Sequence, residues 1–180
     1  MREHLIPFSI NPSIEKQIRI LNCGQFKGSD PLVKEGRVLK NGEYVLHIFT
    51  KGKGVYYNEN KNVQMFGPNT IIISYPNRWH AITPQVDSVL DHWYVMCSGE
   101  LIGNLFARLH RDDIDIFSIT KNQIYLKKFI DIVQCIRMNS RRSVHKAHAL
   151  LYELIMDTAY LHESTSDKLS YTITDNFVGY

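Results

Sequence analysis

The sequence predicts a mainly β fold in which an antiparallel β-barrel is followed by an antiparallel pair of helices. Up to about residue 98, short apolar stretches alternate with turns rich in Gly, Pro and Asn, at spacings of about 8–12 residues. After residue 98, apolar residues recur every three or four positions, as on one face of a helix. A chain of 180 residues has the length of one such domain.

Six segments in the first half have strand character: residues 18–26, 44–50, 55–57, 63–66, 70–75 and 89–97. The second segment ends at the turn Lys51-Gly52-Lys53-Gly54, where glycine supplies a positive φ. Residues 58–62 form a polar hairpin tip, and Gly67-Pro68-Asn69 is a further turn. With six to eight short strands, residues 18–98 are expected to form the barrel.

Residues 99–163 are expected to be helical. Residues 100–110 form a short helix, residues 126–136 carry an apolar stripe, and Ser143 is placed to cap a last helix over 144–161. The stripe of this last helix is wider than packing on one sheet requires, which predicts a homodimer interface. The candidate dimerisation residues are Leu150, Leu151, Leu154, Thr158 and Leu161.

Composition and charge exclude several classes. Hydrophobic residues make up 44% and charged residues 22%, as in ordinary globular domains rather than disordered chains. The net charge of +3 is spread along the chain, so we do not expect this chain itself to bind DNA. The chain has neither an apolar run of about 18 residues nor a signal peptide at its start, and its three cysteines show no metal or disulfide spacing. We expect a cytoplasmic protein.

The histidines do not predict a metal centre. A barrel with a His in the turn Tyr75-Pro76-Asn77-Arg78-Trp79-His80 suggests a cupin, but a catalytic metal normally needs three protein ligands. No His-x-His pair accompanies His80, because His47 and His92 each stand alone on their strands. His80 is therefore interpreted as a structural or ligand-contacting residue. No metal, cofactor or catalytic residue is predicted, and no catalytic loop motif indicates an enzyme.

Binding of a small polar molecule is better supported. Alternation along residues 89–97 places Asp91 and Trp93 on one face, where a carboxylate and an indole could hold a polyol if that face lined the barrel. The equally weighted alternative is that Trp93 belongs to the core and that Asp91 pairs with Arg37 or Arg19.

Three runs resemble the sensor domain of AraC-type transcription regulators. They are Arg37 followed by Glu43-Tyr44-Val45-Leu46-His47-Ile48-Phe49-Thr50-Lys51-Gly52-Lys53-Gly54, then Met65 to His80, then Asp91-His92-Trp93-Tyr94-Val95-Met96-Cys97-Ser98-Gly99. The resemblance extends over residues 18–162. It implies a cupin-like barrel, or double-stranded β-helix, that binds an effector, often a sugar, followed by helices that dimerise.

The resemblance also implies roles for individual residues. Arg37 corresponds to a sugar-contacting arginine and Trp93 to an indole beneath the sugar ring. Asp91 and Ile82 stand where the arabinose regulator has a polar His and a hydrogen-bonding Tyr, so arabinose itself is not expected. Residues 1–17 would form an N-terminal arm, from which Pro7 and Phe8 could touch the ligand.

The sequence thus predicts the effector-sensing and dimerisation domain of an AraC-type regulator, not an enzyme. Its ligand would be a sugar or related metabolite, and residues 164–180 would lead toward a helix-turn-helix DNA-binding domain outside this chain. Two alternatives are a small cupin enzyme, such as a sugar isomerase or epimerase, and a free-standing dimeric ligand-binding protein.

Overall fold

The computed structural model describes residues 5–7, 11–30, 36–60, 62–109, 116–120 and 122–174. This part of the chain forms nine strands and four helices. In order they are α1 (Pro12–Gln17), β1 (Arg19–Gly28), β2 (Arg37–Val38), β3 (Glu43–Lys51), β4 (Gly54–Asn58), β5 (Val63–Phe66), β6 (Thr70–Ser74), β7 (Trp79–Pro84), β8 (Leu90–Ser98), α2 (Glu100–Leu109), β9 (Ile116–Ser118), α3 (Asn122–Met138) and α4 (Arg141–Thr174). The predicted mainly β fold with C-terminal helices is confirmed.

The strands form two sheets. The larger has the order β1-β8-β3-β6-β9 and the smaller β2-β7-β4-β5, and every named strand pairing is antiparallel. Apolar side chains from both sheets meet between them in one cluster of Phe49, Tyr56, Phe66, Ile72, Ile82 and Leu90. The barrel interior is therefore the space between the two sheets, closed on one side by this apolar cluster.

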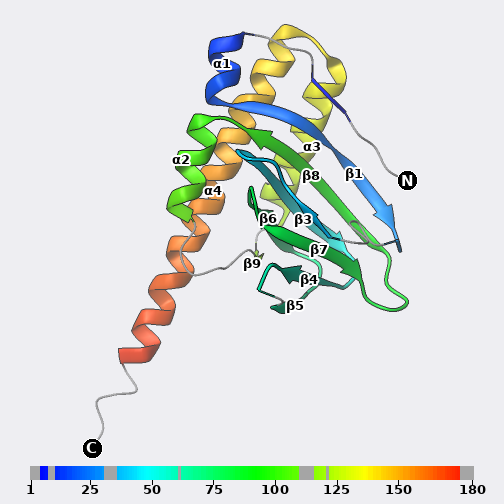
Figure 1. Cartoon of the computed structure of the whole chain (residues 1–180), viewed down its shortest axis with the longest axis vertical. Coiled ribbons are helices and arrows are strands. Elements are labelled where there is room, and N and C mark those ends of the chain that lie inside the picture. The colour runs from blue at the N-terminus through cyan, green and yellow to red at the C-terminus, as the bar shows by residue number, and fades with distance from the viewer. Residues whose placement is uncertain are drawn as a thin grey trace, which may run out of the picture.

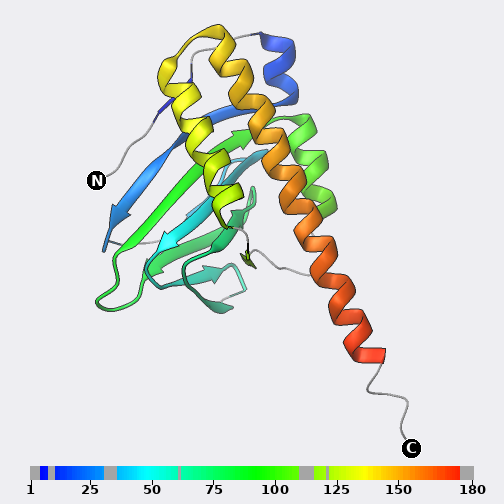
Figure 2. The ribbon, with the colours of Figure 1, turned by 180° about the vertical axis from the view of Figure 1, so that it is seen from behind.

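Helices cover the opposite face of the larger sheet. In Figure 1, α3 and α4 pass behind the larger sheet, and Figure 2 shows them running across that face. Strand β3 is buried on both faces, with Leu46 and Ile48 in the cluster that includes the helices. Its alternate residues, including His47 and Phe49, face the barrel interior.

An ion-pair network joins the two C-terminal helices, and a serine caps the second of them. Lys128 of α3 donates from Nζ to Asp157 Oδ2 of α4 at 2.7 Å and lies 3.2 Å from Glu153 Oε2. Ser140, not Ser143, caps α4, since the Ser143 backbone N–H donates to Ser140 Oγ at 3.1 Å. The helix then runs to Thr174, and its C-terminal half projects away from the sheets (Figures 1 and 2).

Four elements were not expected from the sequence. Strands β2 and β7 lie outside the six predicted strand segments, and β7 begins at Trp79, within the predicted turn that carries His80. Strand β9 adds a fifth strand to the larger sheet within the segment predicted to be helical, pairing Ile71 with Phe117. Helix α1 lies in the predicted arm and begins at Pro12, where Asn11 Oδ1 accepts a hydrogen bond from the Ser13 N–H at 2.9 Å. Among the described residues, no helix is both long and apolar enough to cross a membrane.

Candidate functional site

Polar side chains gather inside the barrel beside its apolar cluster. The pairing of β3 with β8 places His47 opposite Tyr94 and Phe49 opposite His92, all on the interior face. The ring centroids of His47 and His92 are 5.2 Å apart, and those of Phe49 and His92 are 4.9 Å apart. Both imidazoles are buried among these aromatic rings.

Arg37 and His80 join these imidazoles from the smaller sheet. Strand β2 pairs with β7 so that Arg37 and His80 are opposite each other, and the Arg37 Nε–H donates to His80 Nε2 at 3.4 Å. A guanidinium can only donate, so Nε2 must accept, and the proton of a neutral His80 is on Nδ1. Nδ1 lies 3.5 Å from the Arg78 carbonyl oxygen, which can accept that proton's hydrogen bond. We call Arg37, His47, His80 and His92 the Arg–His cluster.

Electrostatics keeps His47 and His80 neutral. Burial, together with the charge of Arg37, lowers the pKa of His80 to about 4. Burial also lowers the pKa of His47 well below its ordinary value, and His92, Arg37 and His80 lower it further. Burial lowers the pKa of Arg37 as well, against the opposing influence of Glu43 and Tyr94, but a guanidinium remains protonated. At neutral pH, Arg37 is therefore positively charged, whereas His47 and His80 are neutral.

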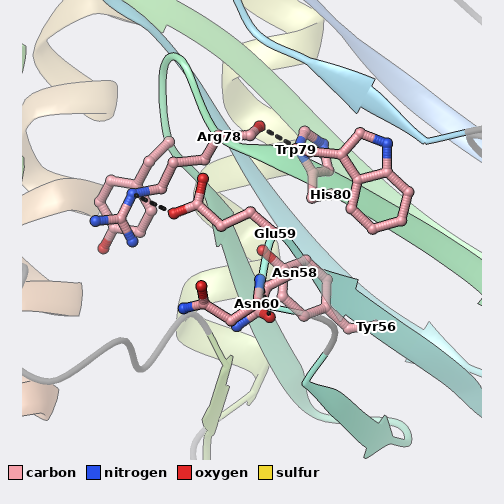
Figure 3. Close-up of a pocket in the computed structure, with 8 residues that line it drawn as sticks. Tyr56, Asn58, Glu59, Asn60, Arg78, Trp79 and His80 are labelled. Carbon is pink, nitrogen blue, oxygen red and sulfur yellow. Dashed lines mark hydrogen bonds and ion pairs between the residues drawn. The ribbon is translucent and has the colours of Figure 1, made fainter.

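A narrow pocket reaches His80 from outside the barrel (Figure 3). It measures about 260 Å³ with its open mouth included, but it has room for only about one water molecule. Arg78 beside it is already engaged, because its Nε lies 3.6 Å from Glu59 Oε1 and its guanidinium carbon lies 5.8 Å from the centre of the Tyr75 ring. The lining residues are Tyr56, Asn58, Glu59, Asn60, Tyr75, Arg78, Trp79 and His80.

The structure does not bring all the sequence-predicted ligand residues to one place: some lie inside the barrel and others on the helix side of the larger sheet. Arg37 and His80 come together inside the barrel. Ile82 also faces the interior, where it is 1% exposed and packs in the apolar cluster. Pro7 is half-buried, two residues after Leu5, which pairs with Cys23 at the edge of β1. Phe8 lies outside the described residues.

Asp91 and Trp93 do not face the barrel interior, so the predicted convergence of these residues with Arg37 is wrong. Trp93 packs against the cluster on the helix side of the larger sheet, as its core alternative required. Asp91 Oδ1 accepts a hydrogen bond from Gln25 Nε2 at 2.9 Å instead of pairing with Arg37 or Arg19. Alternation correctly grouped the two residues but did not reveal which face was inside.

Most of the predicted dimerisation residues are used within the chain. Leu151, Leu154 and Thr158 are fully buried, and the Thr158 hydroxyl donates to the Leu154 carbonyl oxygen at 2.8 Å. Leu150 is half-buried against the same core, and Leu161 lies in α4 with its side chain outside the described part. The assignment of the buried three residues to an interface is corrected, because their face of α4 packs against the domain itself.

His47 and His92 belong to the Arg–His cluster, but the sequence analysis did not predict them as ligand-binding residues because they form no His-x-His pair. The available signal was different: each His occupies an interior-facing position of a long strand, next to an aromatic or apolar residue two positions away. Within the described residues, no three His, Cys, Asp or Glu side chains are arranged to hold a metal ion. The Arg–His cluster offers hydrogen-bond donors and acceptors instead.

Comparison with solved structures finds proteins of low sequence identity. YhaK from Escherichia coli is 11% identical, with 67% of this chain and 52% of that one covered and a TM-score of 0.48. An RmlC-like cupin from Methanocaldococcus jannaschii is 13% identical over 58% of this chain and 85% of that one, with a TM-score of 0.38. ToxT from Vibrio cholerae is 14% identical over 64% of this chain and 47% of that one, with a TM-score of 0.42.

The chain thus spans about half the length of YhaK and of ToxT. A comparison with curated protein sequences finds no match. A comparison with protein-family models does find a match: the model of the AraC-like ligand binding domain matches residues 40–155, from the turn before β3 into α4. Because this match covers more than half of the chain, the chain belongs to the family of AraC-like ligand-binding domains.

Proposed function

We propose that this domain senses a small polar effector bound inside its barrel and belongs to a transcription regulator rather than to an enzyme. The observation that carries the proposal is the Arg–His cluster, a set of polar side chains placed between two sheets and beside the apolar cluster that they enclose. Binding sites of this kind combine an apolar enclosure with a few oriented polar groups.

A sugar or related metabolite is the effector class that the sequence resemblance favours. The Arg–His cluster supports a polar ligand, because a neutral His47 offers a donor and an acceptor inside the barrel and Arg37 offers further donors. Asp91 and Trp93, which the polyol interpretation relied on, take no part in this proposal. The narrowness of the pocket at His80 means that ligand entry must widen it, by movement of side chains such as Trp79, which is 37% exposed.

We further propose that the domain forms a homodimer through α4. Tyr152, Met156 and Tyr160 recur every four residues, so they share one face of the helix, and they are 41%, 41% and 72% exposed. Leu151 and Leu154 occupy the buried face. An aromatic and methionine stripe on the outer face is the composition that interface cores favour.

In the proposed mechanism, the effector shifts the relative populations of arrangements of the dimer. It can do so only to the extent that it binds one arrangement more tightly than another. A DNA-binding domain connected through the end of α4 would respond to that shift. DNA binding is accordingly proposed for the regulator as a whole rather than for this domain.

A thermal-shift screen of sugars, sugar acids and other small metabolites tests the effector proposal. A ligand present at 100 times its Kd stabilises the native state by about 2.7 kcal/mol, which is readily measured as a rise in Tm. At least one compound should raise the Tm of the unmodified chain and not that of a variant with Arg37→Gln and His80→Gln together. If every stabilising compound acts equally on both proteins, the barrel is not the effector site.

A further inference from the structure

Arg37 places a positive charge inside the barrel without an anionic partner in contact. Its one hydrogen bond among the described residues goes to a neutral acceptor, His80, and it forms no ion pair with them. Glu43 is the acidic side chain that influences it, but a Glu43 carboxylate oxygen accepts instead from the Lys40 backbone N–H at 3.1 Å. The outer N–H groups of the guanidinium are therefore available to a ligand.

His47 is a second group that lacks a partner. It is 6% exposed, and within the described part of the chain neither ring nitrogen has a hydrogen-bond partner. The hydroxyl of Ser74, paired with Val45 on the interior face, is equally buried and also without a partner in that part. Buried polar groups are normally satisfied, so two such groups on one interior face indicate that something outside the protein completes them.

The charge balance defines what that ligand carries. With His47 and His80 neutral, Arg37 supplies the one positive charge among these three side chains. The flat fork of its guanidinium matches the two oxygens of a carboxylate. A phosphate dianion would bring more negative charge than one arginine neutralises. Arg78, at the pocket, is not an alternative anion site because Glu59 already pairs with it.

We propose that the effector carries a carboxylate, which binds the outer N–H groups of Arg37 and an N–H of His47. This inference rests on the proposed function and narrows it to acids, sugar acids included, over neutral sugars. The remainder of the molecule lies toward the pocket in Figure 3, since His80 both contacts Arg37 and lines that pocket. Trp79 and Asn58 line the same pocket and restrict the shape of the part of the ligand attached to the acid group.

Matched acids and neutral compounds test the proposal. The probes are gluconate, hexanoate and acetate, their uncharged counterparts glucose, 1-hexanol and acetamide, and inorganic phosphate. Each is titrated into the full chain while Tm and the imidazole ¹⁵N shifts of His47 are followed. We expect a carboxylate, and not its uncharged counterpart or phosphate, to raise Tm and to move the His47 signals.

Variants test whether the carboxylate binds at the Arg–His cluster. Arg37→Gln should weaken carboxylate binding at least tenfold, and Arg37→Lys, which keeps a point charge but not the fork, should weaken it less. Arg141→Gln, at an exposed arginine that begins α4, is the matched control and should bind as the unmodified chain does. Circular dichroism checks that each variant is folded, and Arg37→Lys alone decides the test if Arg37→Gln does not fold.

The outcomes separate this inference from the function on which it rests. Carboxylate affinity unchanged in both Arg37 variants would overturn the inference. Binding of glucose but of no carboxylate, lost in His80→Gln, would also overturn it, while leaving a polar effector site in the barrel intact. Absence of binding by every acid and every uncharged probe would contradict both.

Discussion

The Nε–H of Arg37 donates to Nε2 of His80 across the pair of strands β2 and β7, at 3.4 Å. The contact fixes His80 as a neutral imidazole protonated on Nδ1, because its other nitrogen must accept from a cation. Arg37 in turn is held with its remaining N–H groups unused by the described residues. One hydrogen bond therefore determines the tautomer of His80 and leaves the outer N–H groups of Arg37 available.

His80 should make the stability of the domain depend on pH. Its pKa is lowered to about 4 in the folded chain, against about 6.5 when unfolded, so its contribution is complete above pH 6.5 and is lost as the pH falls toward 4. Between pH 7.5 and pH 5, the free energy of unfolding should fall by about 2 kcal/mol through this group alone.

Urea unfolding of the unmodified chain and of His80→Gln checks this expectation. Glutamine can still accept from Arg37 but does not titrate. The free energy of unfolding of the unmodified chain, minus that of the variant, should therefore fall by about 2 kcal/mol from pH 7.5 to pH 5. Burial, the largest influence on the pKa of His47, is the same in both proteins, and His80 is the smallest, so most of the His47 contribution cancels in the comparison. Parallel pH profiles would show that His80 is not held neutral by burial.

Met156→Asp should dissociate the proposed homodimer without unfolding the domain. Met156 is 41% exposed and central in the stripe between Tyr152 and Tyr160, so a charge there is tolerated in a monomer but is buried unpaired in a dimer. Leu154→Asp should unfold the chain instead, because Leu154 is fully buried within it.

Sedimentation equilibrium at ~50 μM, above the ~μM Kd of ordinary interfaces, measures the outcome. Gln134→Asp, at an exposed position of α3, is the control and should remain dimeric. A monomeric unmodified chain at this concentration, or a Met156→Asp protein that is still dimeric, would rule out the α4 stripe as the interface.

Asp91→Ala should leave effector affinity unchanged. Its side chain accepts from Gln25 on the helix side of the sheet, so the variant loses one hydrogen bond worth about 0.5–1.5 kcal/mol of stability. Calorimetric titration with a carboxylate that binds the unmodified chain makes the measurement, with Arg37→Gln as the variant that must lose affinity. A loss of tenfold or more in Asp91→Ala would restore the polyol site that the sequence predicted.

Gly52→Ala should be much more destabilising than Gly42→Ala. Both glycines have a positive φ, +85° and +76°, so either substitution costs about 1–2 kcal/mol in backbone conformation. At Gly52 an added Cβ would also lie 2.4 Å from the Val89 carbonyl oxygen, whereas at Gly42 nothing lies within 4 Å. The midpoints of thermal unfolding should rank Gly42→Ala above Gly52→Ala, and equal midpoints would contradict the close packing of this turn.

Strand alternation and helical periodicity were sufficient to predict the fold class, because they depend on local burial. They could not assign the inside of the barrel, since β3 and β8 pack on both faces: Leu46 and Trp93 toward the helices, His47 and His92 toward the smaller sheet. That choice is made by long-range packing. Strand β9 was missed for the same reason, because a three-residue strand is defined by its pairing with β6 rather than by its own pattern.

The most direct test of effector binding inside the barrel uses the two tryptophans as reporters for the two faces of the larger sheet. Trp79 lines the pocket at His80, and Trp93 packs on the helix side. A binding carboxylate is titrated into the Trp93→Phe and the Trp79→Phe proteins, and indole emission is recorded. Saturable change in the Trp79 emission of the first protein, abolished by Arg37→Gln, is the expected result; change confined to the Trp93 emission of the second would place the ligand on the helix side and contradict the barrel site.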